Sequence, residues 1–125
     1  MNMIPLNEIS TSALAYLGDC VMELQVRERL VESGLSKSGH LHDASLKFVK
    51  ASAQASAMEK ILPLLTPEEE QWYKRGRNTG HLNVPKSSNP AEYRMATGME
   101  VLFGYLHLAG KQERIKELFE LAYPG

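Results

Sequence analysis

A helical pattern of apolar residues contains the segment Leu14-Ala15-Tyr16-Leu17-Gly18-Asp19-Cys20-Val21. Asn7 and Ser10 can each cap the start of this pattern, which predicts a helix to about Glu32. Gly18 and Asp19 interrupt its apolar face. A glycine inside a helix costs roughly 1 kcal/mol relative to alanine, and a carboxylate beside buried surface is costly unless it is paired or bound to a cation. The interruption indicates either close helix packing with an arginine partner for Asp19, or a site that uses the carboxylate.

A second run, Tyr93 to Leu106, has the same arrangement. Its single acid, Glu100, lies among apolar residues, with Gly98 and Gly104 nearby. Alone, Glu100 is equally consistent with an exposed helical glutamate that has no role. If the two helices cross at their small residues, Asp19 and Glu100 meet. Such a pair is expected to bind a hard cation such as Mg²⁺, which prefers carboxylate, water and phosphate oxygens.

The rest of the pattern predicts an all-α, helical-bundle fold of five to seven helices. The helices are expected at 10–32, 38–65 with a bend near Val49, 67–77, 90–108 and 112–122. Gly34 and Gly110 are placed to end two of them. Residues 78–90 contain turn formers throughout and predict one long polar loop, which in so small a protein is often functional.

Composition predicts one domain over residues 1–125. The chain has 43% hydrophobic and 23% charged residues, enough for a core without disulfides. Its single cysteine, Cys20, cannot form an intrachain disulfide, and we interpret it as a small core residue rather than a catalytic thiol. Because no signal peptide or membrane-spanning run is recognisable, the protein is expected to be cytoplasmic and without a membrane partner.

Positive charge is concentrated in one segment. The formal net charge is −1, yet residues 71–95 have five basic residues and one acidic residue, a local charge of +4. The rest of the chain, with 9 basic and 14 acidic residues, carries −5. Such a segment predicts a surface for phosphate backbones, although an ordinary solvated charged face would look the same. The candidate contacts to phosphates are Lys74, Arg75, Arg77, Lys86 and Arg94, which become candidate RNA-binding residues through the family resemblance of the two acidic stretches.

Both acidic stretches resemble motifs of the ribonuclease III catalytic domain. Leu14 to Val21 (LAYLGDCV) is similar to that family's signature LEFLGDAV, and Ala96 to Leu106 is similar to its second acidic helix, ADxxEALIGAL. The short chain, the segment from Lys74 to Asn78 and the run that begins at Tyr93 look more like the Mini-ribonuclease III subfamily, which lacks a double-stranded-RNA-binding domain. The similarity extends from about Ser10 to Leu121.

The resemblance implies a homodimeric, Mg²⁺-dependent endonuclease that cuts double-stranded RNA, with the stem of precursor 23S ribosomal RNA as the expected substrate. Asp19 matches the invariant aspartate and Glu100 the metal-binding glutamate, so both are expected to be catalytic residues and metal ligands. Three other acidic positions of the family differ and hold Ser12, Ala15 and Thr97. Waters, Thr97 and RNA phosphates would therefore complete the coordination.

The resemblance also implies a dimer interface around Tyr16 and Leu17 and around the helix that contains Met99 and Phe103. Two other function classes are consistent with the sequence. The missing acids favour a non-cleaving double-stranded-RNA-binding scaffold with a degenerate ribonuclease III fold. A helical interaction protein without an RNA role is less consistent with the positively charged segment.

Overall fold

Six α-helices and two short 3₁₀ turns make up the parts of the chain that the computed structural model describes, residues 4–79 and 89–125. The helices are α1 (Thr11–Glu32), α2 (Ser38–Val49), α3 (Ala51–Ile61), α4 (Pro67–Arg77), α5 (Pro90–Leu108) and α6 (Gln112–Ala122). The 3₁₀ turns are η1 (Leu6–Glu8) and η2 (Leu62–Leu64). No strand occurs in these ranges, and the predicted all-α class is confirmed.

Local capping sets where three of the helices start. Ser10 accepts a hydrogen bond from the N–H of Ala13 at the start of α1, and Asn89 accepts hydrogen bonds from the first turn of α5. At α4, the Thr66 hydroxyl accepts from the Glu69 N–H while the Glu69 carboxylate accepts from the Thr66 N–H. These bonds satisfy N–H groups that have no partner within the helix, so the starts follow from nearby residues alone.

Backbone conformation sets the other boundaries. Gly34 and Gly110 have φ angles of +96° and +75°, a left-handed conformation that stops α1 and α5 as expected. Lys50 is extended, with φ −63° and ψ 145°, and divides the predicted helical stretch 38–65 into α2 and α3 beside Val49.

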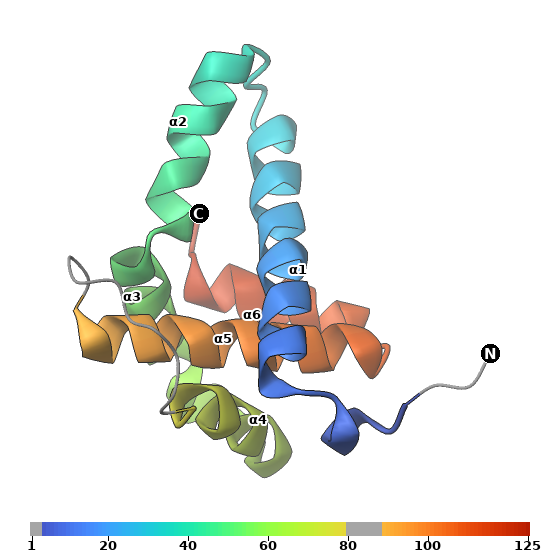
Figure 1. Ribbon diagram of the computed structural model, residues 1–125. Helices are drawn as coiled ribbons and strands as arrows, with labels where there is room; N and C mark the ends of the chain where they lie inside the picture. The colour runs from blue at the N-terminus through green and yellow to red at the C-terminus, as the bar shows by residue number, and fades with distance from the viewer. Residues whose placement is uncertain (1–3, 80–88) are drawn as a thin grey trace.

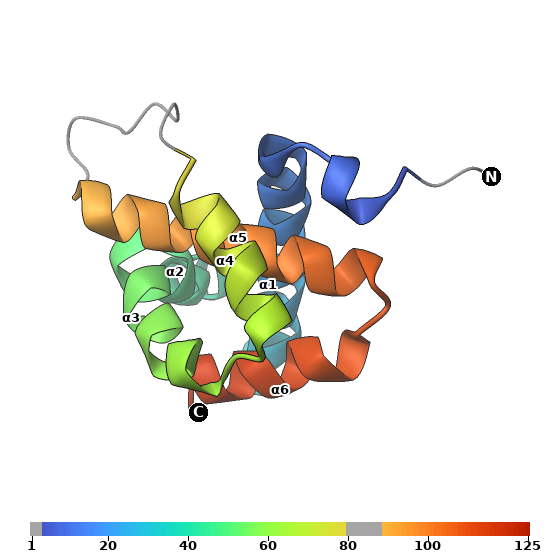
Figure 2. The same ribbon diagram turned by 90° about the horizontal axis from the view of Figure 1, so that it is seen from below.

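α5 is the central helix of the fold. Its residues from Ala96 to Leu106 are buried except for Glu100, which is partly buried. Figure 1 shows α1 crossing α5 near the N-terminal end of α1, and Figure 2 shows α4 lying across the same helix. The first acidic stretch, the positively charged segment and the second acidic stretch are thereby placed on three helices in mutual contact.

α2 lies beside the C-terminal half of α1 and has no fully buried residue. Phe48 attaches its last turn to the core, with its ring centroid 5.3 Å from that of Tyr123. None of the helices in the described residues is long and apolar enough to cross a membrane.

Candidate active site

Glycine backbones form the crossing of α1 and α5. A Cβ atom added at Gly18 would lie 1.6 Å from the backbone oxygen of Glu100, and one added at Gly104 would lie 2.2 Å from the backbone oxygen of Leu14. No side chain fits into either space, so the two helices meet backbone to backbone. Because Asp19 follows Gly18 and Glu100 lies at the contact, the crossing brings the two acids together.

The two acidic side chains differ in exposure and interact directly. Asp19 is exposed, whereas Glu100 is partly buried. The pKa of Glu100 is raised to about 8, first by burial and then by the negative charge of the Asp19 carboxyl and a hydrogen bond with it. Within the described residues neither acid forms an ion pair, so the arginine partner that would make Asp19 purely structural is not found there.

The neighbouring positions add no further carboxylate to the pair. Thr97 is buried, and its hydroxyl donates a hydrogen bond to the backbone oxygen of Tyr93 at 3.0 Å. Glu23, one helical turn after the aspartate, forms an ion pair with Arg27 at 2.7 Å. In residues 4–79 and 89–125, no three His, Cys, Asp or Glu residues are grouped so that they could hold a metal. The ligands available there are thus two carboxylates, a set that fits Mg²⁺ with its remaining positions taken by water.

The stability of the metal-free protein should fall as the pH rises. The pKa of Glu100 is about 8 in the folded chain against an ordinary value of 4.5. Between these values the folded state keeps a proton that the unfolded state has lost, so raising the pH favours unfolding. The contribution of Glu100 is therefore fully present below about pH 4.5, and we expect the free energy of unfolding to fall by up to about 4 kcal/mol by pH 8.

A Glu100→Gln variant should lack most of this decline and should unfold at a higher temperature than wild type at pH 9. Thermal denaturation with chelator from pH 5 to pH 9 measures the difference. Identical pH dependence in the two proteins would show that the Glu100 pKa is not raised.

Lys74 and Arg75 on α4 have partners inside the protein. Lys74 is exposed and forms an ion pair with Glu70 at 2.8 Å. Arg75 is half-buried, and its Nε donates to the hydroxyl of Thr11 at 3.0 Å while its Nη2 donates to the backbone oxygen of Ile9. The Arg75 guanidinium is thus bound to the start of α1 rather than free at the surface.

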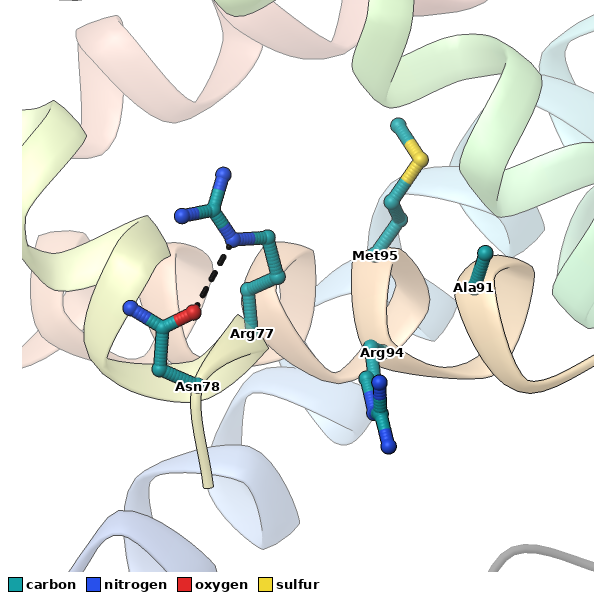
Figure 3. A pocket seen from close by; sticks show the side chains of 5 residues that line it. All are labelled: Arg77, Asn78, Ala91, Arg94 and Met95. Carbon is teal, nitrogen blue, oxygen red and sulfur yellow. Dashed lines mark hydrogen bonds between the residues drawn. The ribbon is translucent and has the colours of Figure 1, made fainter. Parts of the chain in front are cut away.

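Arg77 and Arg94 line an open hollow of about 490 Å³ between the end of α4 and the start of α5, together with Asn78, Ala91 and Met95. The Arg77 Nε donates to the side-chain oxygen of Asn78 at 3.1 Å, and Arg94 is exposed. In Figure 3 the two guanidinium groups extend in different directions, so a single phosphate would not bind both. Lys86, the fifth predicted RNA contact, lies outside the described residues.

The outer face of α1 departs from the sequence-based interpretation. Cys20 is exposed, so its prediction as a core residue is wrong. Tyr16, Leu24 and Val31 are also exposed, at 86%, 55% and 63%. Positions 16, 20 and 24 follow the four-residue spacing of one helix face, a signal present in the sequence. It was missed because α1 carries apolar residues on two faces, and periodicity alone does not tell which one meets the core.

Comparisons with known proteins give a consistent result. The family model described as Ribonuclease III domain matches residues 12–111. Mini-ribonuclease 3 from Symbiobacterium thermophilum is 47% identical over 109 residues, which cover 87% of this chain and 84% of that protein. Mini-ribonuclease 3 from Enterococcus faecalis is 44% identical over 113 residues, which cover 89% of this chain and 86% of that protein. A crystal structure of a protein from Fusobacterium nucleatum superposes with a TM-score of 0.80, at 30% sequence identity and 90% coverage of each chain.

Proposed function

This chain belongs to the ribonuclease III family and is an endoribonuclease, and from that premise we propose that it cleaves double-stranded RNA with Mg²⁺ held by Asp19 and Glu100. The observation that carries the proposal is the direct interaction of these two carboxyl groups at the α1–α5 crossing. The experiment that tests it is magnesium-dependent cleavage of duplex RNA by wild type and by variants of the two carboxylates.

The two carboxyl groups are suited to a divalent cation by their charge and by their placement. Once Glu100 is ionised the pair carries −2, and a cation between the groups offsets both the repulsion and the burial that hold the pKa of Glu100 near 8. Asp19 offers its carboxylate at the surface, where an RNA phosphate has access, and α5 holds Glu100 beneath it. When bound, Mg²⁺ supplies Lewis acidity toward the scissile phosphate.

We propose that Lys74, Arg77 and Arg94 contact RNA phosphates, with Lys86 as a further contact outside the described residues. Side chains do not easily reach base edges in the deep major groove of an A-form duplex, so contacts fall mainly on phosphates and 2′-hydroxyls. Arg77 and Arg94 lie at the end of α4 and the start of α5, on either side of the segment predicted as a long polar loop, most of which (80–88) lies outside the described residues. Arg75 is left out of this surface because its guanidinium is bonded to α1.

Replacing either Arg77 or Arg94 with Ala should weaken duplex RNA binding and lower its salt dependence. Each lost phosphate contact is expected to reduce the slope of log K against log salt by about 1, because fewer counterions are released. Fluorescence anisotropy at several salt concentrations measures the slope. Lys116→Ala is the control, since Lys116 is exposed on α6, which Figure 2 shows far from the end of α4 that carries Arg77. Slopes unchanged from wild type would remove both arginines from the RNA surface.

We propose that the active form is a homodimer and that the exposed apolar face of α1, formed by Tyr16, Cys20, Leu24 and Val31, is covered by a second copy. Large apolar side chains grouped on a surface helix are typical of an interaction site, and a two-fold dimer uses the same face of each subunit. Two active sites are then available for the two strands of a duplex.

The predicted interface also includes the helix that contains Met99 and Phe103. These two side chains are fully buried in the core of their own subunit, so they are not themselves contacts to a partner. A contribution of α5 to the interface stays a prediction, and it would come from the exposed residues of that helix.

Leu24→Glu should convert the protein to a monomer by placing a charge in the proposed interface. Sedimentation velocity of wild type and variant measures the assembly state. Leu64→Glu, at a side chain that is 49% exposed in η2 and away from α1, is the matched control and should remain dimeric. A Leu24→Glu variant that sediments like wild type would exclude this face as the interface.

The proposals for the RNA substrate and the cellular location follow from the resemblance of the two acidic motifs to the Mini-ribonuclease III subfamily. We propose that the substrate is the base-paired stem of precursor 23S ribosomal RNA and that cleavage takes place in the cytoplasm. We also propose that residues 1–125 act as one catalytic domain. Accumulation of unprocessed 23S precursor in cells that lack the protein would support the substrate assignment.

A further inference from the structure

The contact between α1 and α5 at Gly18 and Gly104 does not by itself fix the rotation of α1 about its own axis. Other contacts must set this rotation. At Gly18 and Gly104 the helices touch through backbone, with no side chains that interlock at the crossing point. On the C-terminal side of the crossing, α1 buries four apolar side chains in the core: Val21, Met22, Val26 and Leu30. On the N-terminal side only Leu14 is fully buried, while Leu17 and, in η1, Leu6 are partly buried against the core. The start of α1 is thus held by fewer buried side chains than its C-terminal half, and a further restraint acts there.

Arg75 supplies that restraint. Its Nε donates to the Thr11 hydroxyl at 3.0 Å, and its Nη2 donates to the backbone oxygen of Ile9. In the described residues these are the side-chain hydrogen bonds that join α4 to the beginning of α1. The backbone oxygen of Arg75 accepts a hydrogen bond from the Thr79 hydroxyl at 2.8 Å. This bond holds Arg75 at the end of α4.

The same guanidinium is connected to α5 through aromatic rings. The Arg75 guanidinium carbon lies 5.2 Å from the ring centroid of Trp72. Trp72 stacks on Tyr105 of α5, with ring centroids 4.8 Å apart and ring planes 11° apart. Tyr105 follows Gly104, the residue that meets the backbone of Leu14 on α1. These contacts thus connect α1 to α4, α4 to α5, and α5 back to α1 around the crossing.

We infer that Arg75 is a positioning residue that sets the rotation of α1 over α5, and hence the separation of the Asp19 and Glu100 carboxylates, rather than a contact to RNA. The inference rests on the proposed function of that pair. A planar guanidinium donates to two oxygens and stacks on a ring at once, whereas a lysine ammonium does not reproduce this geometry. Lysine does keep the positive charge that a phosphate contact needs. Arg75→Lys therefore separates the two roles.

The test compares Arg75→Lys with wild type in three measurements, at a temperature well below unfolding of either protein. Electron paramagnetic resonance titration gives the affinity for Mn²⁺ alone, single-turnover kinetics give the cleavage rate, and anisotropy gives RNA affinity and its salt slope. We expect the cleavage rate to fall about tenfold or more and Mn²⁺ binding to weaken, because a displacement of about 1 Å in such a site is costly. RNA affinity and its salt slope should remain at the wild-type values.

Arg114→Lys is the matched control. Arg114 is similarly multidentate, donating to the Glu69 carboxylate at 2.8 Å and to the backbone oxygen of Leu64 at 3.1 Å, but it joins α6 to α4 and has no hydrogen bond to α1. This control should lose stability while keeping the wild-type Mn²⁺ affinity and cleavage rate.

Wild-type Mn²⁺ affinity and cleavage rate in Arg75→Lys would overturn the inference and leave the nuclease proposal intact. A lower salt slope in Arg75→Ala, restored by Arg75→Lys, would also overturn it by making Arg75 an RNA contact. If wild type itself neither binds Mn²⁺ nor cleaves duplex RNA, the proposed function fails, and the inference fails with it.

Discussion

Asp19→Asn or Glu100→Gln should reduce the cleavage of duplex RNA by about 10³-fold or more while leaving RNA affinity at the wild-type value. Each change keeps the size of the side chain and removes one of the two carboxylates that interact at the α1–α5 crossing. Losing a metal ligand costs several kcal/mol of transition-state stabilisation, and about 1.4 kcal/mol corresponds to a factor of ten in rate. The phosphate contacts proposed for α4 and the start of α5 should not be affected by these changes.

Single-turnover cleavage of a long RNA duplex in Mg²⁺ measures this effect, and chelator should abolish the wild-type reaction. Glu23→Gln is the matched control on α1, since Glu23 is one turn from Asp19 but is paired with Arg27. It should keep activity within a few-fold of wild type. If wild type binds duplex RNA but does not cut it with any divalent cation, the protein is instead a non-cleaving RNA-binding scaffold.

Gly18→Ala and Gly104→Ala should each prevent stable folding or lower the free energy of unfolding by about 4 kcal/mol or more. The added Cβ atoms would lie 1.6 Å from the backbone oxygen of Glu100 and 2.2 Å from that of Leu14. Backbone does not move aside as a flexible side chain does, so the helices would have to separate. Separation would also move Asp19 away from Glu100, and any folded fraction should therefore bind Mn²⁺ weakly.

Gly39→Ala is the control for the glycine substitutions. Gly39 lies in α2, and a Cβ atom there would have no neighbour within 4 Å. Alanine also favours helix by up to about 1 kcal/mol, so this variant should be as stable as wild type or slightly more stable. Urea denaturation monitored by circular dichroism compares the three variants. Wild-type stability in Gly18→Ala would contradict the backbone contact between α1 and α5.

Helix boundaries were predictable because they depend on residues close together in the chain. Ser10, Thr66 and Asn89 cap the helices that follow them, and Gly34 and Gly110 end the helices that precede them. The meeting of Asp19 and Glu100 was also expected, since each is a lone acid near a glycine on an apolar helix. Glycine marks positions where two helices can approach closely, so the pattern contained information on the crossing as well as on the helices.

The roles of Cys20, Phe103 and Arg75 depended on tertiary structure. Periodicity shows that a helix has an apolar face, but not whether that face meets the core of the same subunit. Cys20 is therefore exposed on α1 while Phe103 is buried on α5. Likewise, the sequence shows a positive charge at position 75, but the oxygens of Ile9 and Thr11 become its partners only when α4 is folded against the start of α1. Local patterns thus determined the helices and their acidic residues, whereas long-range packing decided which side chains stay free for a ligand or a second subunit.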